Sequence, residues 1–200
     1  MCQSEVCRIR MCSRYGRPRT RCRTLATVPK HCRRKVAGMA IRDVCVVYIL
    51  RGHASDAQVL LGYKRTGMGL GRVVGIGGNA EPGESVVDAA VREVREETGL
   101  EIDAALLEPV GRLVYRFPSR DSWSQRSHVF VYRAPVVEPV ETDEIVPAWF
   151  GLDEVPYDRM WDDARRWLPA VLRGGTAYGS YTFGDDLATV VAESPGTPAA

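Results

Sequence analysis

From Met39 onward, short apolar runs alternate with polar, glycine-containing turns, a pattern that predicts a domain of short strands and two helices. Residues 44–50 form a continuous apolar run of strand length that is rich in β-branched side chains, and residues 58–63 form a second. Further strands are predicted at about 72–76, 113–117, 128–133 and 148–151, and a hairpin around Gly184 and Asp185 closes the domain. These elements indicate an α+β fold.

The clearest helix is predicted over residues 84–97. Apolar side chains recur there at spacings of three and four residues, which place them on one helix face: Val87, Ala90, Val91 and Val94. Gly99 stands where a C-terminal cap belongs. A second helix is predicted over about 160–172, and the last residues, 193–200, have the composition of a frayed tail.

The charge pattern divides the chain near Val36. Residues 1–35 carry eleven Lys or Arg and one acid, whereas residues 36–200 carry sixteen basic and twenty-four acidic residues. The first segment also holds five of the six cysteines and has almost no apolar periodicity, so we expect it to be disordered. We favour the interpretation that translation starts at Met39 and that residues 1–38 are an upstream misreading.

Other interpretations of residues 1–38 stay open. The five cysteines stand five, five, ten and ten residues apart, which lacks the paired Cys-x2–4-Cys spacing of zinc sites. An Arg-rich, acid-poor segment fits an organelle transit peptide, but a secretory signal peptide is excluded because no apolar stretch follows the positive charges. A nucleic-acid-binding tail is a further reading of the positive charge, although Tyr15 is its one aromatic residue.

Composition limits the classes of protein to which the chain can belong. A hydrophobic fraction of 45% and a charged fraction of 26% are typical of globular domains, and no run approaches the roughly 18 apolar residues that cross a membrane. We therefore expect one cytoplasmic domain over residues 39–194, a C-terminal tail over 195–200, and no membrane or stable nucleic-acid partner. Cys45 lies within an apolar run and is predicted to be a small core residue.

Candidate chemistry lies on the first predicted helix. Residues three and four apart are neighbours on a helix, so Glu93, Glu96 and Glu97 form a carboxylate cluster along one edge. Adjacent anions repel one another, and Mg²⁺ or Mn²⁺, which prefer oxygen ligands, would relieve that repulsion. The alternative from clustering alone is a solvated acidic face that is paired with Arg92 and Arg95.

The spacing of the whole segment favours the metal site. Gly78 is followed after five residues by Glu84 and after seven more by the run 92–100, REVREETGL. This arrangement resembles the signature of the Nudix hydrolases. The resemblance implies an α/β/α sandwich with a mixed central sheet and a loop-helix-loop metal site that bridges a substrate diphosphate.

The same resemblance implies roles for individual residues. Glu93 and Glu97 would be the main metal ligands, with Glu96 close by and the Gly77 carbonyl as a further oxygen. Gly77 and Gly78 would also lie against substrate. Arg92 would orient the carboxylates through Glu84. The protein would then need no covalent nucleophile, because metal ions neutralise the phosphate oxygens and water attacks in line, its proton passing to one of the clustered carboxylates or to Glu144.

Similarity extends over about residues 39–194 and is greatest to the oxidised-purine nucleoside triphosphatase branch of the family. Residues 60–78 and 141–168 carry it. In that branch Lys64 would lie near the nucleotide and Glu144 would be an additional metal ligand, whereas Trp161 would stack on the purine and Asp163 would bind the base edge. The implied reaction is hydrolysis of a nucleotide substrate such as 8-oxo-dGTP to the monophosphate and pyrophosphate, by a monomer or homodimer.

Two departures weaken the predicted base recognition. Val73-Val74 stands where the branch has Trp-Asn, and Ala164 replaces one member of an acidic pair, which leaves Asp163. Other Nudix substrates therefore stay open, namely ADP-ribose, nucleotide sugars and dinucleoside polyphosphates, and so does a non-catalytic nucleotide sensor. The structural alternatives for these side chains also remain: the tryptophans Trp149, Trp161 and Trp167 as core residues, and Asp162 and Asp163 as caps of the second helix.

Overall fold

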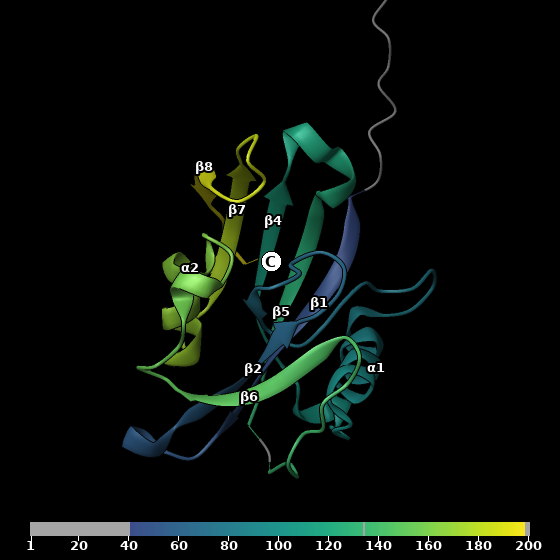
Figure 1. Cartoon of the computed structure of the whole chain (residues 1–200), viewed down its shortest axis with the longest axis vertical. Helices are drawn as coiled ribbons and strands as arrows, with labels where there is room; N and C mark the ends of the chain where they lie inside the picture. The colour runs from purple at the N-terminus through teal and green to yellow at the C-terminus, as the bar shows by residue number, and fades with distance from the viewer. Residues whose placement is uncertain (1–40, 134, 199–200) are drawn as a thin grey trace, which may run out of the picture. The chain divides into compact units, whose positions relative to one another are not determined.

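The structure is a computed structural model that describes residues 41–133 and 135–198 (Figure 1). The chain divides into two units, Met1–Gly38 and Met39–Ala200. The expectations for residues 1–38, which were disorder, an upstream misreading, a zinc site, a transit peptide or a nucleic-acid-binding tail, lie outside the described residues. In the part of the chain that is described, neither helix has the length and apolar character that crossing a membrane requires.

One mixed sheet of eight strands organises the described unit. Its order is β3-β2-β1-β5-β4-β7-β8, and β6 pairs with the whole length of β2, whose other edge is shared by β1 and β3. β1 runs parallel to β5 and β4 parallel to β7, whereas all other pairs are antiparallel. The strands are β1 Arg42–Arg51, β2 Gln58–Lys64, β3 Val73–Val74, β4 Glu108–Arg116, β5 Gln125–Tyr132, β6 Ile145–Gly151, β7 Ala177–Phe183 and β8 Val190–Pro195.

The two helices lie on opposite sides of this sheet (Figure 1). Successive side chains of a strand point to opposite faces, and β1 accordingly sends Val47 and Ile49 to the core beneath α1 (Val86–Thr98). Tyr48 and Leu50 instead join the core beneath α2 (Ala164–Leu172). The continuous apolar run is thus explained by burial on both faces, and the α+β sandwich expected from the sequence is confirmed. Cys45 is buried as predicted.

The first helix begins at Val86 rather than at residue 84, because Ser85 caps it. The Ser85 hydroxyl accepts a hydrogen bond from the backbone N–H of Asp88 at 3.1 Å. At the other end, Gly99 has a left-handed φ of 70° and donates its N–H to the Arg95 carbonyl, as the position of the glycine predicted. These two caps fix which residues of α1 face the sheet and which carry the carboxylates.

The predicted start of the second helix is wrong. A 3₁₀ turn spans Tyr157–Arg159, and Met160 then adopts an extended conformation with φ −91° and ψ −176°, so α2 begins at Ala164. The predicted C-terminal tail is also wrong in part. Residues 193–195 of that tail belong to β8 and pair with β7, and Gly196 also bonds to β7. Most side chains of β8 are exposed, so backbone hydrogen bonds hold this edge strand in place.

Candidate active site

Glu97 is the most deeply buried carboxylate of the α1 cluster, with 2% of its surface exposed. One of its oxygens accepts the backbone N–H of Gly77 at 2.9 Å, and the other accepts the Lys64 ammonium at 2.6 Å. Lys64 also reaches Glu144, on the segment before β6, at 3.1 Å. A single ammonium group therefore joins β2, α1 and the start of β6.

Glu93 lies one helical turn before Glu97 and packs against the backbone of Gly78. A Cβ atom at Gly78 would lie 2.5 Å from a Glu93 carboxylate oxygen, so a side chain at that position would force the carboxylate to move. Gly78 was predicted to lie against substrate. In the structure, Gly78 also leaves space for the Glu93 carboxylate.

Arg92 joins the other acidic residues of this region into one network. Its guanidinium donates two parallel hydrogen bonds, both 2.9 Å, to the Glu84 carboxylate. It also donates to Glu93 at 2.9 Å, to Glu96 at 3.0 Å and to the Asn79 carbonyl at 3.0 Å. Arg92 thus contacts Glu84, as the resemblance implied, and it also contacts the cluster directly.

Burial and mutual repulsion determine the protonation of these groups. Burial raises the pKa of Glu97, and the Lys64 ammonium offsets part of that rise. Burial likewise raises the pKa of Glu93, and repulsion from Glu97 and Glu96 adds to the effect although Arg92 opposes it. Hydrogen bonds from Arg92 lower the pKa of Glu84 to about 2. Burial thus opposes the charged forms of Glu93 and Glu97, whereas Arg92 stabilises the charged form of Glu84.

The donor set suits a hard divalent cation. Glu93, Glu96, Glu97 and Glu144 supply carboxylate oxygens beside the Gly77-Gly78 backbone, which is the ligand chemistry that Mg²⁺ and Mn²⁺ prefer. Among residues 41–133 and 135–198, however, no three acidic, cysteine or histidine side chains already converge on one point. Lys64 bonds to both Glu97 and Glu144, so a cation bound among the carboxylates would replace these ammonium contacts.

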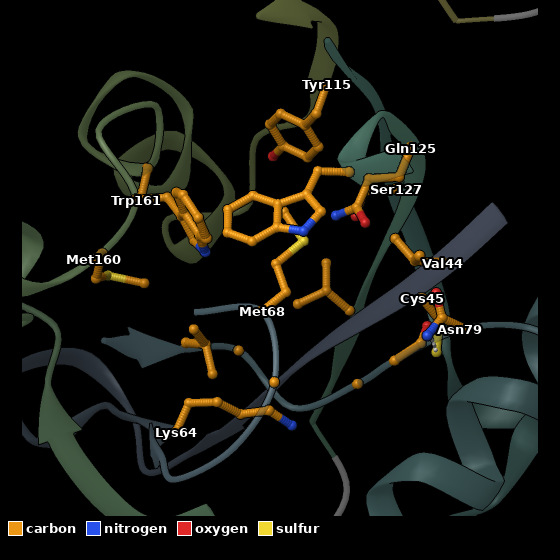
Figure 2. Close-up of a pocket in the computed structure, with 18 of the residues that line it drawn as sticks. Val44, Cys45, Lys64, Met68, Asn79, Tyr115, Gln125, Ser127, Met160 and Trp161 are labelled. Carbon is orange, nitrogen blue, oxygen red and sulfur yellow. Dashed lines mark hydrogen bonds between the residues drawn. The ribbon is translucent and has the colours of Figure 1, made fainter. Parts of the chain in front are cut away.

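A cavity of about 1000 Å³ opens beside the cluster. Eight of the ten predicted site residues line it: Lys64, Gly77, Gly78, Glu93, Glu96, Glu144, Trp161 and Asp163. Glu97 and Arg92 contact these lining residues. Figure 2 shows Trp161 and Tyr115 toward the top of the cavity, Lys64 at the bottom and Asn79 on the right. The cavity therefore has an aromatic end and a charged end.

Asp163 is the buried polar residue of the aromatic end, with 2% of its surface exposed. Its Oδ2 accepts hydrogen bonds from the Tyr115 hydroxyl at 2.9 Å and from Trp167 Nε1 at 2.7 Å. Its Oδ1 is buried and has no partner among the described residues. Burial raises the pKa of this carboxyl group against the two hydrogen bonds. Asp163 precedes α2 but its side chain does not cap the helix, because that side chain is turned inward.

The three tryptophans take different positions. Trp167 is core, since 7% of it is exposed and its ring meets Tyr48 edge-on. Trp149 packs partly against the α1 core and lies under the Arg51 guanidinium, 4.0 Å from the ring centroid. Trp161 lines the cavity, and the guanidinium of Arg72 lies 4.3 Å from its ring centroid. Trp161 therefore keeps its predicted place at the pocket.

Sequence reasoning missed three residues of the aromatic end. Tyr115 holds Asp163, Arg72 stacks on Trp161, and Trp123 lines the cavity beside them. Each acts through a contact with a residue far away in the chain, so no local spacing indicates it. The one usable signal was the aromatic content of the segment between β4 and β5.

Comparison with known proteins identifies the family. The profile described as NUDIX domain matches residues 39–171. The chain therefore belongs to the Nudix hydrolases and is a pyrophosphohydrolase of that family. A protein of Danio rerio named oxidized purine nucleoside triphosphate hydrolase is 36% identical over 128 residues, which cover 63% of this chain and 79% of the relative. The protein of that name in Mus musculus is 36% identical over 130 residues, which cover 64% and 80%.

Solved structures share the fold. A MutT protein from Bacillus halodurans superposes with a TM-score of 0.59 at 23% identity and covers 77% of this chain and 97% of its own. The Nudix domain of Shewanella oneidensis NrtR, complexed with ADP ribose, gives a TM-score of 0.56 at 16% identity and covers 68% and 89%. At these identities the likeness is one of fold alone.

The position of Gly78 against Glu93 makes a testable prediction. Gly78→Ala places a methyl group where the Glu93 carboxylate lies and moves the carboxylate by about an ångström, so we expect pyrophosphohydrolase activity to fall about tenfold to a hundredfold. The matched control is Gly151→Ala, where the new Cβ meets the exposed Glu154 carboxylate at 3.2 Å, away from the cavity. Equal activities of the two variants, measured at matched Tm, would contradict this account of Gly78.

Proposed function

We propose that this Nudix hydrolase cleaves nucleoside triphosphates to nucleoside monophosphates and pyrophosphate in a reaction that depends on divalent cations. We further propose that oxidised purine nucleotides such as 8-oxo-dGTP are among its substrates. The observation that carries the proposal is the cavity with an acidic cluster at one end and Trp161 and Asp163 at the other. The names of the relatives from Danio rerio and Mus musculus support the choice of substrate.

The charged end would bind the phosphates. Glu93, Glu96, Glu97 and Glu144 would hold Mg²⁺ or Mn²⁺, which when bound supplies charge neutralisation and activates water. Lys64 would leave Glu97 and donate to a phosphate oxygen, because its ammonium is the one lysine nitrogen that lines the cavity. Arg92 would keep the Glu93 and Glu96 carboxylates oriented from behind through its contact with Glu84.

The aromatic end would bind the base. One face of the half-buried Trp161 ring lies under the Arg72 guanidinium, and the other face would offer a stacking surface that any purine can use. Asp163 Oδ1 is a buried polar atom that needs a partner, and the edge of a base would supply one. Val74 also lines the cavity, and both its methyl group and Trp161 Nε1 border the space beside Gly69, where an added Cβ would lie 3.6 Å and 3.5 Å from them. Its apolar side chain adds no hydrogen bond.

A nucleotide sensor on the same fold is the second candidate. A sensor needs to bind a nucleotide without hydrolysing it, and loss of a cluster carboxylate would be the simplest route. Glu93, Glu96 and Glu97 are all present and all border the cavity or contact its lining. This favours the enzyme.

The carboxylate cluster generates the first test of this function. Glu97→Gln removes a ligand charge while hardly changing the side-chain volume, so we expect kcat to fall at least about a hundredfold, equivalent to several kcal/mol of lost charge stabilisation. A chelator should abolish turnover by the unaltered protein. Glu101→Gln, at an exposed glutamate beyond the helix, is the control and should retain full activity. Turnover that persists in the chelator or in the Glu97→Gln protein would overturn the metal-dependent mechanism.

Base preference gives the second test. Val74→Asn would add a side-chain amide beside Trp161 and should change the 8-oxo-dGTP to dGTP ratio of kcat/KM by about threefold to tenfold, the worth of one hydrogen bond. Asp163→Asn should lower kcat/KM for both nucleotides while leaving cation affinity unchanged. If Val74→Asn left the kcat/KM ratio unchanged and Asp163→Asn left both kcat/KM values unchanged, the base would not bind at this end of the cavity. The substrate would then be sought among ADP-ribose and nucleotide sugars.

A further inference from the structure

A 3₁₀ segment, Pro118–Trp123, connects β4 to β5 and brings a second indole to the cavity. Trp123 is half-buried and lines the cavity together with Trp161. Both side chains belong to one aromatic group, in which Phe117 contacts Trp123 at a centroid distance of 5.7 Å and Trp161 at 6.0 Å. Trp123 therefore borders the same space that the proposed function gives to the base.

Trp123 is held in place from several directions. The Arg120 guanidinium lies over its ring, 4.2 Å from the centroid. Ser119 donates a hydrogen bond to Asp185 on the β7–β8 hairpin, and the Phe117 N–H donates to the Ser124 hydroxyl at 3.0 Å. These contacts join the two ends of the segment to each other and join Ser119 to the β7–β8 hairpin, and so hold Trp123 in the cavity wall.

The angle between the two indoles limits what each can do. Their planes cross at 88° with centroids 6.3 Å apart. A base that stacks on Trp161 lies parallel to that ring and therefore perpendicular to Trp123. Such a base cannot stack on both indoles. Trp123 is left to meet the base edge-on or with its face toward the base edge, where size and hydrogen bonding discriminate between bases.

Trp123 also brings an unused hydrogen-bond donor. Among the described residues, its Nε1–H has no acceptor. Other polar side chains line the cavity as well, among them Gln125 and Ser127 (Figure 2), whereas Asp163 supplies an oxygen and Val74 supplies no polar group. An indole N–H is a donor only, so it would seek a carbonyl oxygen or ring nitrogen on the base.

We propose that Trp123 is a specificity-determining residue, which donates its Nε1–H to an acceptor on the edge of a purine that is stacked on Trp161. This inference rests on the proposed nucleotide function. It extends that function because the base, stacked on Trp161, would also be contacted at its edge by a residue from the β4–β5 connection. A pyrimidine on Trp161 is smaller and falls short of Trp123, so the contact favours purines.

The test separates the indole N–H from the aromatic surface. Trp123→Phe keeps an aromatic ring and removes the donor, and we expect it to weaken dGMP binding about threefold to tenfold while changing dCMP binding less. In turnover assays the same factor should appear in KM for dGTP, with kcat little changed. Trp123→Ala, which removes the surface as well, should lose more.

The matched control is Trp149→Phe, an indole that also lies under an arginine but donates to Glu138 away from the cavity. It should leave dGMP binding unchanged. Binding of dGMP by calorimetry requires no turnover, so it tests Trp123 even if the protein hydrolyses no nucleoside triphosphate, an outcome that would defeat the proposed function alone. The inference would be overturned if the Trp123→Phe protein bound dGMP as tightly as the unaltered protein, or if it lost affinity for dGMP and dCMP equally. It would also be overturned if the unaltered protein did not bind dGMP.

Discussion

The site depends on one buried charge, the Glu97 carboxylate, and on the ammonium of Lys64 that compensates it. A buried carboxylate without a partner is costly, and removing one member of a buried ion pair commonly costs about 3–5 kcal/mol. Here the pair joins α1 to β2 at 2.6 Å, and the Gly77 N–H completes it. Together with the buried apolar side chains Ala89, Ala90 and Val94 beneath the helix, this contact holds α1 and its carboxylates on the sheet.

The remaining charges of the site are arranged in the same way. Arg92 neutralises Glu93 and Glu96 from behind, as Lys64 neutralises Glu97 and Glu144 from the side. Each cation holds carboxylates together that would otherwise repel one another. A divalent cation and a phosphate could exchange with these internal contacts, since the ammonium group would gain phosphate oxygens when it leaves a carboxylate. The aromatic end is separate, because Asp163 Oδ2 accepts its hydrogen bonds there from neutral donors, whereas Oδ1 has no partner among the described residues.

Local patterns predicted helix α1 and its C-terminal cap well, whereas they gave little sign of the aromatic end of the cavity. Helix α1, its Gly99 cap and the cluster on its edge depend on spacings within some twenty residues, and the structure has α1 and its cap close to where they were expected. The start of α2 and the pairing of β8 depend on contacts with distant segments. Trp161 and Asp163 were found through family resemblance, whereas Tyr115 and Trp123 gave no such signal. Their roles arise only when β4, β5 and α2 come together.

The most direct test of the central claim is a crystal structure of the protein with Mn²⁺ and a non-hydrolysable analogue of dGTP, in which anomalous scattering locates the metal. The account predicts Mn²⁺ on Glu93 and Glu97, the Lys64 ammonium moved from Glu97 to a phosphate oxygen, and the base on Trp161. An intact pair between Lys64 and Glu97, with Mn²⁺ bound away from the α1 carboxylates, would contradict it.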